Sequence, residues 1–247
     1  MSRERGAGEP FEDISSGAPA VRGFLHRPAA PSGVALVLTH GAGGNCKAPL
    51  LVALAGAFAE RGVTALRCDL PFRQARPKGP PSPHGAALDR QGLRHAVLAL
   101  RRMTAGTVWL GGHSYGGRQA SMLAAAERGL VDALLLLSYP LRPPGRAQFR
   151  TAHFPELQAP TFFVHGSTDV FGTLAEIEAA RALIPAPTSL LPLDGARHDL
   201  YQGRPEPAAA QQIPERIAAE FLAWRVEPRS PGPPLGDPGS TSVGQSG

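Results

Sequence analysis

The sequence is poor in cysteine. Its 247 residues include only two, Cys46 and Cys68, which lie far apart and outside any Cys-x-x-Cys spacing. A disulfide framework or a zinc site needs more cysteines at closer spacing, so the sequence argues against both. We expect the two thiols to be small buried groups. The prediction is a protein without a metal or a cofactor.

Long hydrophobic runs are also missing. The first ten residues, MSRERGAGEP, carry charges but lack the apolar segment of a signal peptide, and no apolar run is long enough to cross a bilayer. We therefore expect a soluble cytoplasmic protein with no membrane partner.

Lysine-rich runs are absent, although the formal net charge is +5. Nearly all of the cations are arginine, and no RNP, zinc-finger or helix-turn-helix pattern accompanies them. A general bias toward Ala, Arg, Gly and Pro accounts for much of this charge. We therefore expect no nucleic acid partner.

Short apolar segments alternate with longer helical patterns along most of the chain. Several segments, such as VALVLTH and PTFFVHG, are apolar nearly throughout, as strands covered on both faces must be. The predicted strands are Val21–His26, Val34–Thr39, Thr64–Cys68, Val108–Leu110, Ala133–Ser138, Thr161–His165 and Ser189–Pro192. The predicted helices are Leu50–Glu60, Leu88–Met103, Gly117–Glu127, Leu174–Leu183 and Ala208–Trp224, where Pro214 either kinks the last helix or marks its start.

This alternation predicts an α/β fold with a mostly parallel, doubly wound sheet. The stretches FEDIS and AVRGFLHRP predict an antiparallel N-terminal edge. We expect a flexible N-terminus over residues 1–10, one domain over 11–226, and a disordered tail rich in Pro, Gly and Ser over 227–247.

The stretch LGGHSYGG contains a Gly-x-Ser-x-Gly pattern centred on Ser114. In a glycine-rich chain this spacing alone is weak, and a glycine-rich helix entry with a capping serine is the plain alternative. The pattern, however, follows a predicted strand and opens a predicted helix, which is the setting of a nucleophile elbow. There the serine sits on a strained turn, so Gly112 and Gly116 avoid clashes on either side of it. We predict that Ser114 is a nucleophile.

A nucleophilic serine needs a base and an acid, which follow it in the order Ser, acid, His in this kind of fold. His198 lies in the loop after the last predicted strand, and Asp169 in the loop after the preceding one. We predict that His198 accepts the Ser114 proton and that Asp169 orients His198. Asp194 and Asp199 are rival acids, but both lie close to His198 in the same loop.

Backbone N–H groups must stabilise the oxyanion of such a reaction. One is that of Tyr115, and the second is expected from the loop HGAGGN, from Ala42 or next from Gly43. A phosphate-binding glycine loop is the alternative, but the stretch lacks the Gly-Lys-Ser/Thr ending of a P-loop and the third glycine of GxGxxG. His40 and His113 are predicted to hold loops beside the site, with direct substrate contact as the alternative.

Several stretches resemble the α/β hydrolases: LVLTHGAGGN, RGVTALRCDLPF, LGGHSYGGRQAS, LLLSYPLRPPG and LQAPTFFVHGSTDVFG, spread over about residues 34–200. More narrowly, SYPL followed by a basic loop and HGSTD is similar to the family that unites the testis-expressed-30 proteins with an NSL-complex subunit and bacterial relatives. Dienelactone-hydrolase-like enzymes share this architecture but use a cysteine nucleophile. The resemblance implies Ser114, Asp169 and His198 as a triad, and protein partners, because some members are complex subunits.

Two predicted loops at the site are basic and lack acids. One contains Arg73, Arg76 and Lys78, and the other Arg142, Arg146 and Arg150. Arg73 and Arg142 are predicted rim residues that favour an anionic substrate, although a solvated arginine-rich surface is the alternative. The second loop is too short for a large lid, so the site should be open. Possible pocket walls are Tyr115, Tyr139, Phe72 and Phe171, each of which could instead belong to the core.

These features predict a serine hydrolase that cleaves a small ester or thioester through an acyl-enzyme intermediate. A hydrolase fold without turnover, used as an interaction subunit, is the alternative from another class. A further alternative is an acyltransferase, which would pass the acyl group to an acceptor other than water.

Overall fold

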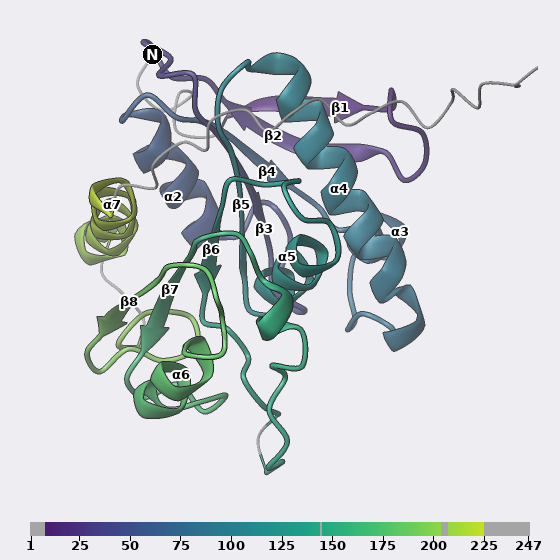
Figure 1. Ribbon diagram of the computed structural model, residues 1–247. Coiled ribbons are helices and arrows are strands. Elements are labelled where there is room, and N and C mark those ends of the chain that lie inside the picture. The colour runs from purple at the N-terminus through teal and green to yellow at the C-terminus, as the bar shows by residue number, and fades with distance from the viewer. Residues whose placement is uncertain (1–7, 144, 204–206, 225–247) are drawn as a thin grey trace, which may run out of the picture.

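The computed structural model describes residues 8–143, 145–203 and 207–224 (Figure 1). These residues form an eight-stranded sheet in the order β1-β2-β4-β3-β5-β6-β7-β8. β2 pairs antiparallel with β1 and β4, and all other pairs are parallel. The strands are β1 (Glu9–Asp13), β2 (Val21–His26), β3 (Ala35–Thr39), β4 (Thr64–Cys68), β5 (Val108–His113), β6 (Ala133–Leu137), β7 (Thr161–Gly166) and β8 (Thr188–Leu193).

Helices cover both faces of this sheet, as Figure 1 shows. α2 and α7 pack together on one face, and α4, α5 and α6 lie on the other. The α-helices are α2 (Pro49–Ala59), α3 (Pro71–Ala75), α4 (Ala86–Met103), α5 (Tyr115–Ala126), α6 (Leu174–Arg181) and α7 (Pro207–Ala223), and the 3-10 turns are η1 (Pro83–Gly85) and η2 (Phe154–Glu156). Within the described residues, no helix is long and apolar enough to cross a membrane.

The central strands supply both halves of the core. In β3, Leu36 and Leu38 point to the α2/α7 side while Ala35 and Val37 point to the α4/α5 side, and all four are at most 1% exposed. This is the result expected when consecutive residues of a strand face opposite helix layers. The predicted α/β fold with a mostly parallel sheet and an antiparallel N-terminal edge is confirmed, and the described residues contain no large lid.

Element boundaries differ modestly from the predictions. β1 begins at Glu9, inside the stretch predicted to be flexible, because its pairing with β2 runs from Glu9 to Asp13. β5 extends to His113, and α5 begins at Tyr115, two residues before the predicted start. α7 continues through Pro214. The predicted tail 227–247 lies outside the described residues.

Candidate active site

Ser114 occupies the one-residue connection between β5 and α5. Its backbone has φ 50° and ψ −115°, a conformation that is costly for a residue with a side chain. The chain turns so tightly there that a Cβ on Gly112 would lie 2.6 Å from the carbonyl carbon of Gly116, and a Cβ on Gly116 would lie 2.5 Å from the oxygen of His40. The glycines on either side of Ser114 are therefore required by the packing of this turn.

His198 and Asp169 meet Ser114 at the carboxyl edge of the sheet. The Oγ of Ser114 lies 2.8 Å from Nε2 of His198, whose Nδ1 lies 2.7 Å from Oδ2 of Asp169. His198 follows β8 and Asp169 follows β7, and parallel pairing brings the ends of these strands to the same edge. A carboxylate at Nδ1 selects the tautomer that leaves Nε2 free to accept the hydroxyl proton.

Asp169 is held as a carboxylate. Burial alone would raise its pKa, but hydrogen bonds from His198 and from the backbone N–H of Phe171 (2.9 Å) outweigh this effect, so the pKa lies below its ordinary value. The rival acids have other partners: Asp199 accepts the N–H of Tyr201 at 3.1 Å, and Asp194 accepts the hydroxyl of Ser167 at 3.3 Å. Of the three candidate acids, Asp169 is the one bonded to the His198 ring.

Two further histidines support the loops of the site. His113 donates from Nε2 to the carbonyl oxygen of His198 at 2.8 Å, and burial lowers its pKa to about 4, which keeps the ring neutral. His40 donates from Nδ1 to the oxygen of Gly41 and accepts the N–H of Leu70 at Nε2 (3.1 Å). Through these hydrogen bonds both histidines connect loops beside Ser114. Both residues also line the cavity at Ser114.

The loop after β3 carries the predicted oxyanion donors. Ala42 and Gly43 line the cavity in front of Ser114. Tyr115 is the first residue of α5, so its N–H has no acceptor within the helix. Arg73 fixes the shape of the loop, because its guanidinium donates to the oxygens of Ala42 and Gly44, both at 2.8 Å. The sequence indicated a charge at position 73 but carried no sign of these acceptors.

The cavity in front of Ser114 has a volume of about 600 Å³. Its walls are mainly backbone and apolar side chains from the β3 loop and α2, including Leu50 and Leu51. The ring of Phe171 stacks on that of His198 with 4.2 Å between centroids. Phe171 is thus a wall of this cavity. The other three aromatic residues considered, Phe72, Tyr115 and Tyr139, are not among its lining residues.

The two predicted rim arginines do not line this cavity. Arg73 is 6% exposed and lines a smaller adjacent cavity with Ala42 and Gly43, and Arg142 forms an ion pair with Glu176 at 2.9 Å. Among the described residues, no lysine or arginine lines the cavity, and its one carboxylate is that of Asp199. The described residues also contain no group of three or more His, Cys, Asp or Glu side chains that could hold a metal ion.

A family model for the alpha/beta hydrolase domain matches residues 32–225. The chain belongs to the alpha/beta hydrolase family. Solved structures with the same fold include an alpha-beta serine hydrolase homologue from Coxiella burnetii, with 19% identity and a TM-score of 0.68 over 86% of this chain and 97% of that one. A dienelactone hydrolase from Anabaena variabilis has 22% identity and a TM-score of 0.66, over 87% and 98% of the two chains. An esterase domain from Rhodothermus marinus has 17% identity and a TM-score of 0.59, over 88% and 98%.

Proposed function

We propose that this alpha/beta hydrolase cleaves a small ester or thioester through an acyl-Ser114 intermediate. The observation that carries the proposal is the continuous hydrogen-bonded line from Ser114 through His198 to Asp169. It starts at a strained serine that opens onto an apolar cavity.

In the proposed reaction, Nε2 of His198 takes the Ser114 proton as Oγ attacks the carbonyl carbon. The N–H groups of Tyr115 and Ala42, or of Gly43, then donate to the oxyanion. When the tetrahedral intermediate collapses, the bond to the leaving oxygen or sulfur breaks, and that atom takes the proton from His198. A water molecule, activated by His198 in the same way, releases the acid and restores Ser114.

The residues that line the cavity indicate which kind of acyl group fits it. Its described walls carry no lysine or arginine, so an uncharged acyl chain fits them better than the anionic one that the basic loops favour. The volume of about 600 Å³ leaves room for an acyl group together with its leaving group. The narrower likeness to the testis-expressed-30 and NSL-complex family, with its protein partners, and the cytoplasmic location stay predictions.

A fluorophosphonate probe tests the proposal directly. The wild-type protein should gain one phosphonyl group by intact-mass spectrometry, and Ser114→Ala should gain none. Ser138→Ala is a matched control, because Ser138 also has a positive φ (47°) at the end of the neighbouring strand but is fully buried with no described hydrogen-bond partner at Oγ. Absence of Ser114-dependent labelling would overturn the proposal and favour an interaction subunit. With an added alcohol as acceptor, release of many equivalents of p-nitrophenol per enzyme with formation of the butyryl ester of that alcohol in place of butyrate would indicate acyl transfer instead.

A further inference from the structure

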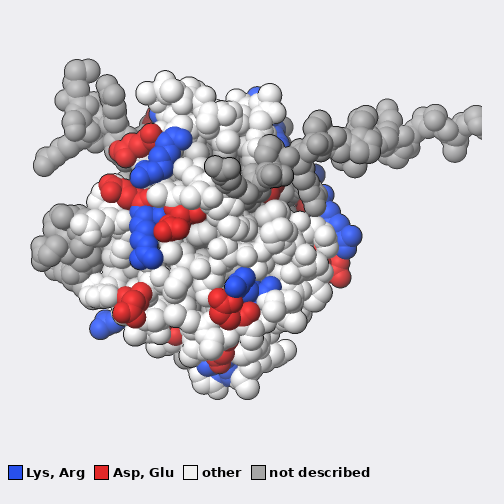
Figure 2. Space-filling view, turned by 60° about the vertical axis from the view of Figure 1, so that its left-hand side comes forward, with Lys and Arg blue, Asp and Glu red and all other residues white. Residues whose placement is uncertain are grey.

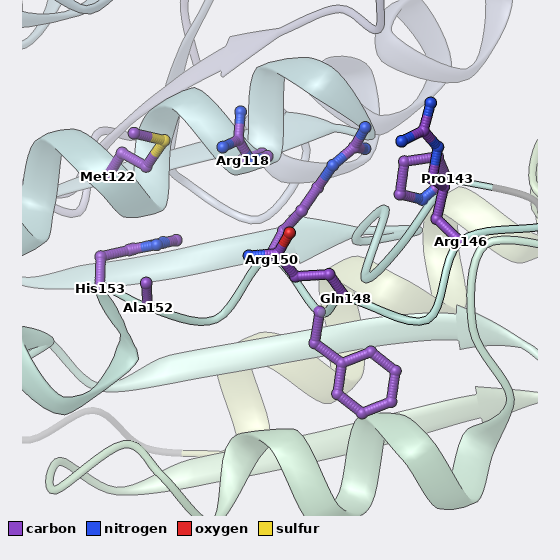
Figure 3. Close-up of a pocket in the computed structure, with 9 residues that line it drawn as sticks. Arg118, Met122, Pro143, Arg146, Gln148, Arg150, Ala152 and His153 are labelled. Carbon is purple, nitrogen blue, oxygen red and sulfur yellow. The ribbon is translucent and has the colours of Figure 1, made fainter.

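A second cavity, of about 660 Å³, lies beside α5 and shares no lining residue with the one at Ser114. One wall consists of Arg118 and Met122 of α5, and the other comes from the loop between β6 and β7, with Arg146, Phe149, Arg150 and His153. Figure 3 shows the side chains of Arg118, Arg146 and Arg150 extending toward the same side from these two segments. We call this the basic pocket.

The residues that line the basic pocket include three arginines and no carboxylate. On the face in Figure 2, basic and acidic side chains lie next to one another. Near the pocket, Arg128 pairs with Glu156 at 2.7 Å. Among the described residues, by contrast, Arg118, Arg146 and Arg150 have no carboxylate within ion-pair distance, and Nε of Arg118 is buried without a hydrogen-bond partner. A buried cationic donor of this kind calls for an acceptor.

The charges of the pocket act on one another. Burial and then the charge of Arg118 lower the pKa of Arg150 below its ordinary value. Burial, followed by the charges of Arg118 and Arg90, lowers the pKa of His153 to about 4. His153 is therefore neutral near pH 7, and the three arginines supply the charge of the pocket. Such uncompensated repulsion is relieved when an anion enters.

Hydrogen bonds from the fold hold the pocket in shape. The hydroxyl of Tyr139 donates to the carbonyl oxygen of Arg150 at 2.6 Å, which anchors the loop to the core. Ser121 donates to the oxygen of Arg118 (2.9 Å), so Nε2–H of His153 donates to Oγ of Ser121 (2.8 Å). These bonds fix the backbone at Arg118 and Arg150 without a ligand, so binding requires less ordering of the chain there.

We propose that the basic pocket binds a small organic phosphate. Guanidinium groups match phosphate oxygens in charge and geometry, and three of them suit a dianion better than a single carboxylate. Met122 and the partly exposed ring of Phe149 provide apolar surface beside the cations, so the organic part of the ligand packs there. The site is separate from the catalytic cavity and does not depend on the proposed hydrolase function.

Calorimetric titration of the full chain with 1-naphthyl phosphate tests this site. We expect saturable binding that weakens at least tenfold in Arg118→Gln and in Arg150→Gln. Arg146 is exposed, so Arg146→Gln gives a second reading in a variant that should fold normally. Arg128→Gln removes an arginine of the neighbouring surface and should leave Kd unchanged. Equal affinity in wild type and all three pocket variants, or no binding at millimolar concentration, would overturn the proposal.

Two further ligands and one variant test the remaining parts of the proposal. 1-Naphthol lacks the anion and should bind at least tenfold more weakly than 1-naphthyl phosphate. Inorganic phosphate should also bind more weakly, and equal binding would overturn the apolar part of the site. Ala48→Trp fills the cavity at Ser114, where Ala48 is a lining residue, and should leave Kd for 1-naphthyl phosphate unchanged. Loss of binding in Ala48→Trp would place the probe in the catalytic cavity. Because the readout is heat of binding, it is independent of any hydrolase activity.

Discussion

Replacing Asp169 by asparagine tests the candidate triad at its least exposed member. Oδ1 of the new side chain can still accept the N–H of Phe171, which is 2.9 Å from Asp169 Oδ1. The amide NH₂ then faces Nδ1 of His198, where the carboxylate stands at 2.7 Å. Because an NH₂ group can only donate, it selects the tautomer with the proton on Nε2, and that proton points at Ser114.

The loss in rate follows from this exchange of tautomers. The ring can no longer accept the Ser114 proton, and the charge that stabilises the imidazolium is gone. The same exchange in a serine protease triad lowers kcat by about 10⁴-fold, or about 5 kcal/mol of barrier. We expect a loss of this order in the steady-state hydrolysis of p-nitrophenyl butyrate, with little change in thermal stability. Asp194→Asn and Asp199→Asn are the matched controls and should stay within about threefold of wild type. An active Asp169→Asn, or an inactive Asp199→Asn, would refute the assignment.

Three other outcomes follow from the contacts of the site and the core. Arg73→Met removes the two bonds to the loop after β3, which carries the proposed oxyanion donors, so kcat should fall by about ten- to a hundredfold while KM changes little. Arg76→Met loses only a bond to Pro80 and should keep the wild-type kcat. Gly116→Ala forces a Cβ to within 2.5 Å of the His40 oxygen and should lower the free energy of unfolding in urea by about 1–3 kcal/mol, whereas Gly56→Ala, with open space at its Cβ in α2, should not. Burial and then the charge of Arg67 lower the pKa of His26 to about 4. Below pH 6.5 the His26 ring therefore binds a proton in the unfolded chain but stays neutral in the folded protein. The free energy of unfolding should therefore drop by about 2 kcal/mol from this group between pH 7 and pH 5. His26→Gln, whose Oε1 can still accept from Arg67 Nε, should remove that part of the drop, while substitution of the exposed His84 should not.

Sheet and core were predictable from the sequence because apolar runs such as ALVLT must be covered on both faces. The turn at Ser114 could also be predicted from the sequence. The Gly-x-Ser-x-Gly pattern places Gly112 and Gly116 at the two positions where close backbone approach leaves no room for a Cβ. His198 and Asp169 could be chosen because each comes directly after a strand of the parallel part of the sheet. These features depend on local pattern and on chain order.

The arginines could not be assigned in the same way. A sequence shows where a cation stands in the chain, but the acceptor that it finds depends on which loops meet across the strand order β4-β3-β5-β6. Arg73 reaches back to the loop after β3, and Arg142 reaches forward to Glu176 of α6. The short helix α3, which carries Arg73, was also not expected, because five residues are too few to give a periodic pattern.

The arginines of this chain therefore have different structural roles. Arg67 is fully buried and donates to His26 at 2.8 Å, Arg73 shapes the loop in front of Ser114, and Arg142 joins the loop after β6 to α6 through an ion pair. Cations with partners of this kind contribute little field to a nearby ligand, because their charge is already compensated by carboxylates or aligned carbonyl dipoles. Unpaired charge acts on a ligand most strongly. In the described chain, three arginines without a carboxylate partner line the cavity beside Arg118, whereas no lysine or arginine lines the cavity at Ser114. For this reason the proposed acyl selectivity of the cavity at Ser114 and the proposed affinity for a phosphate should respond to different sets of substitutions.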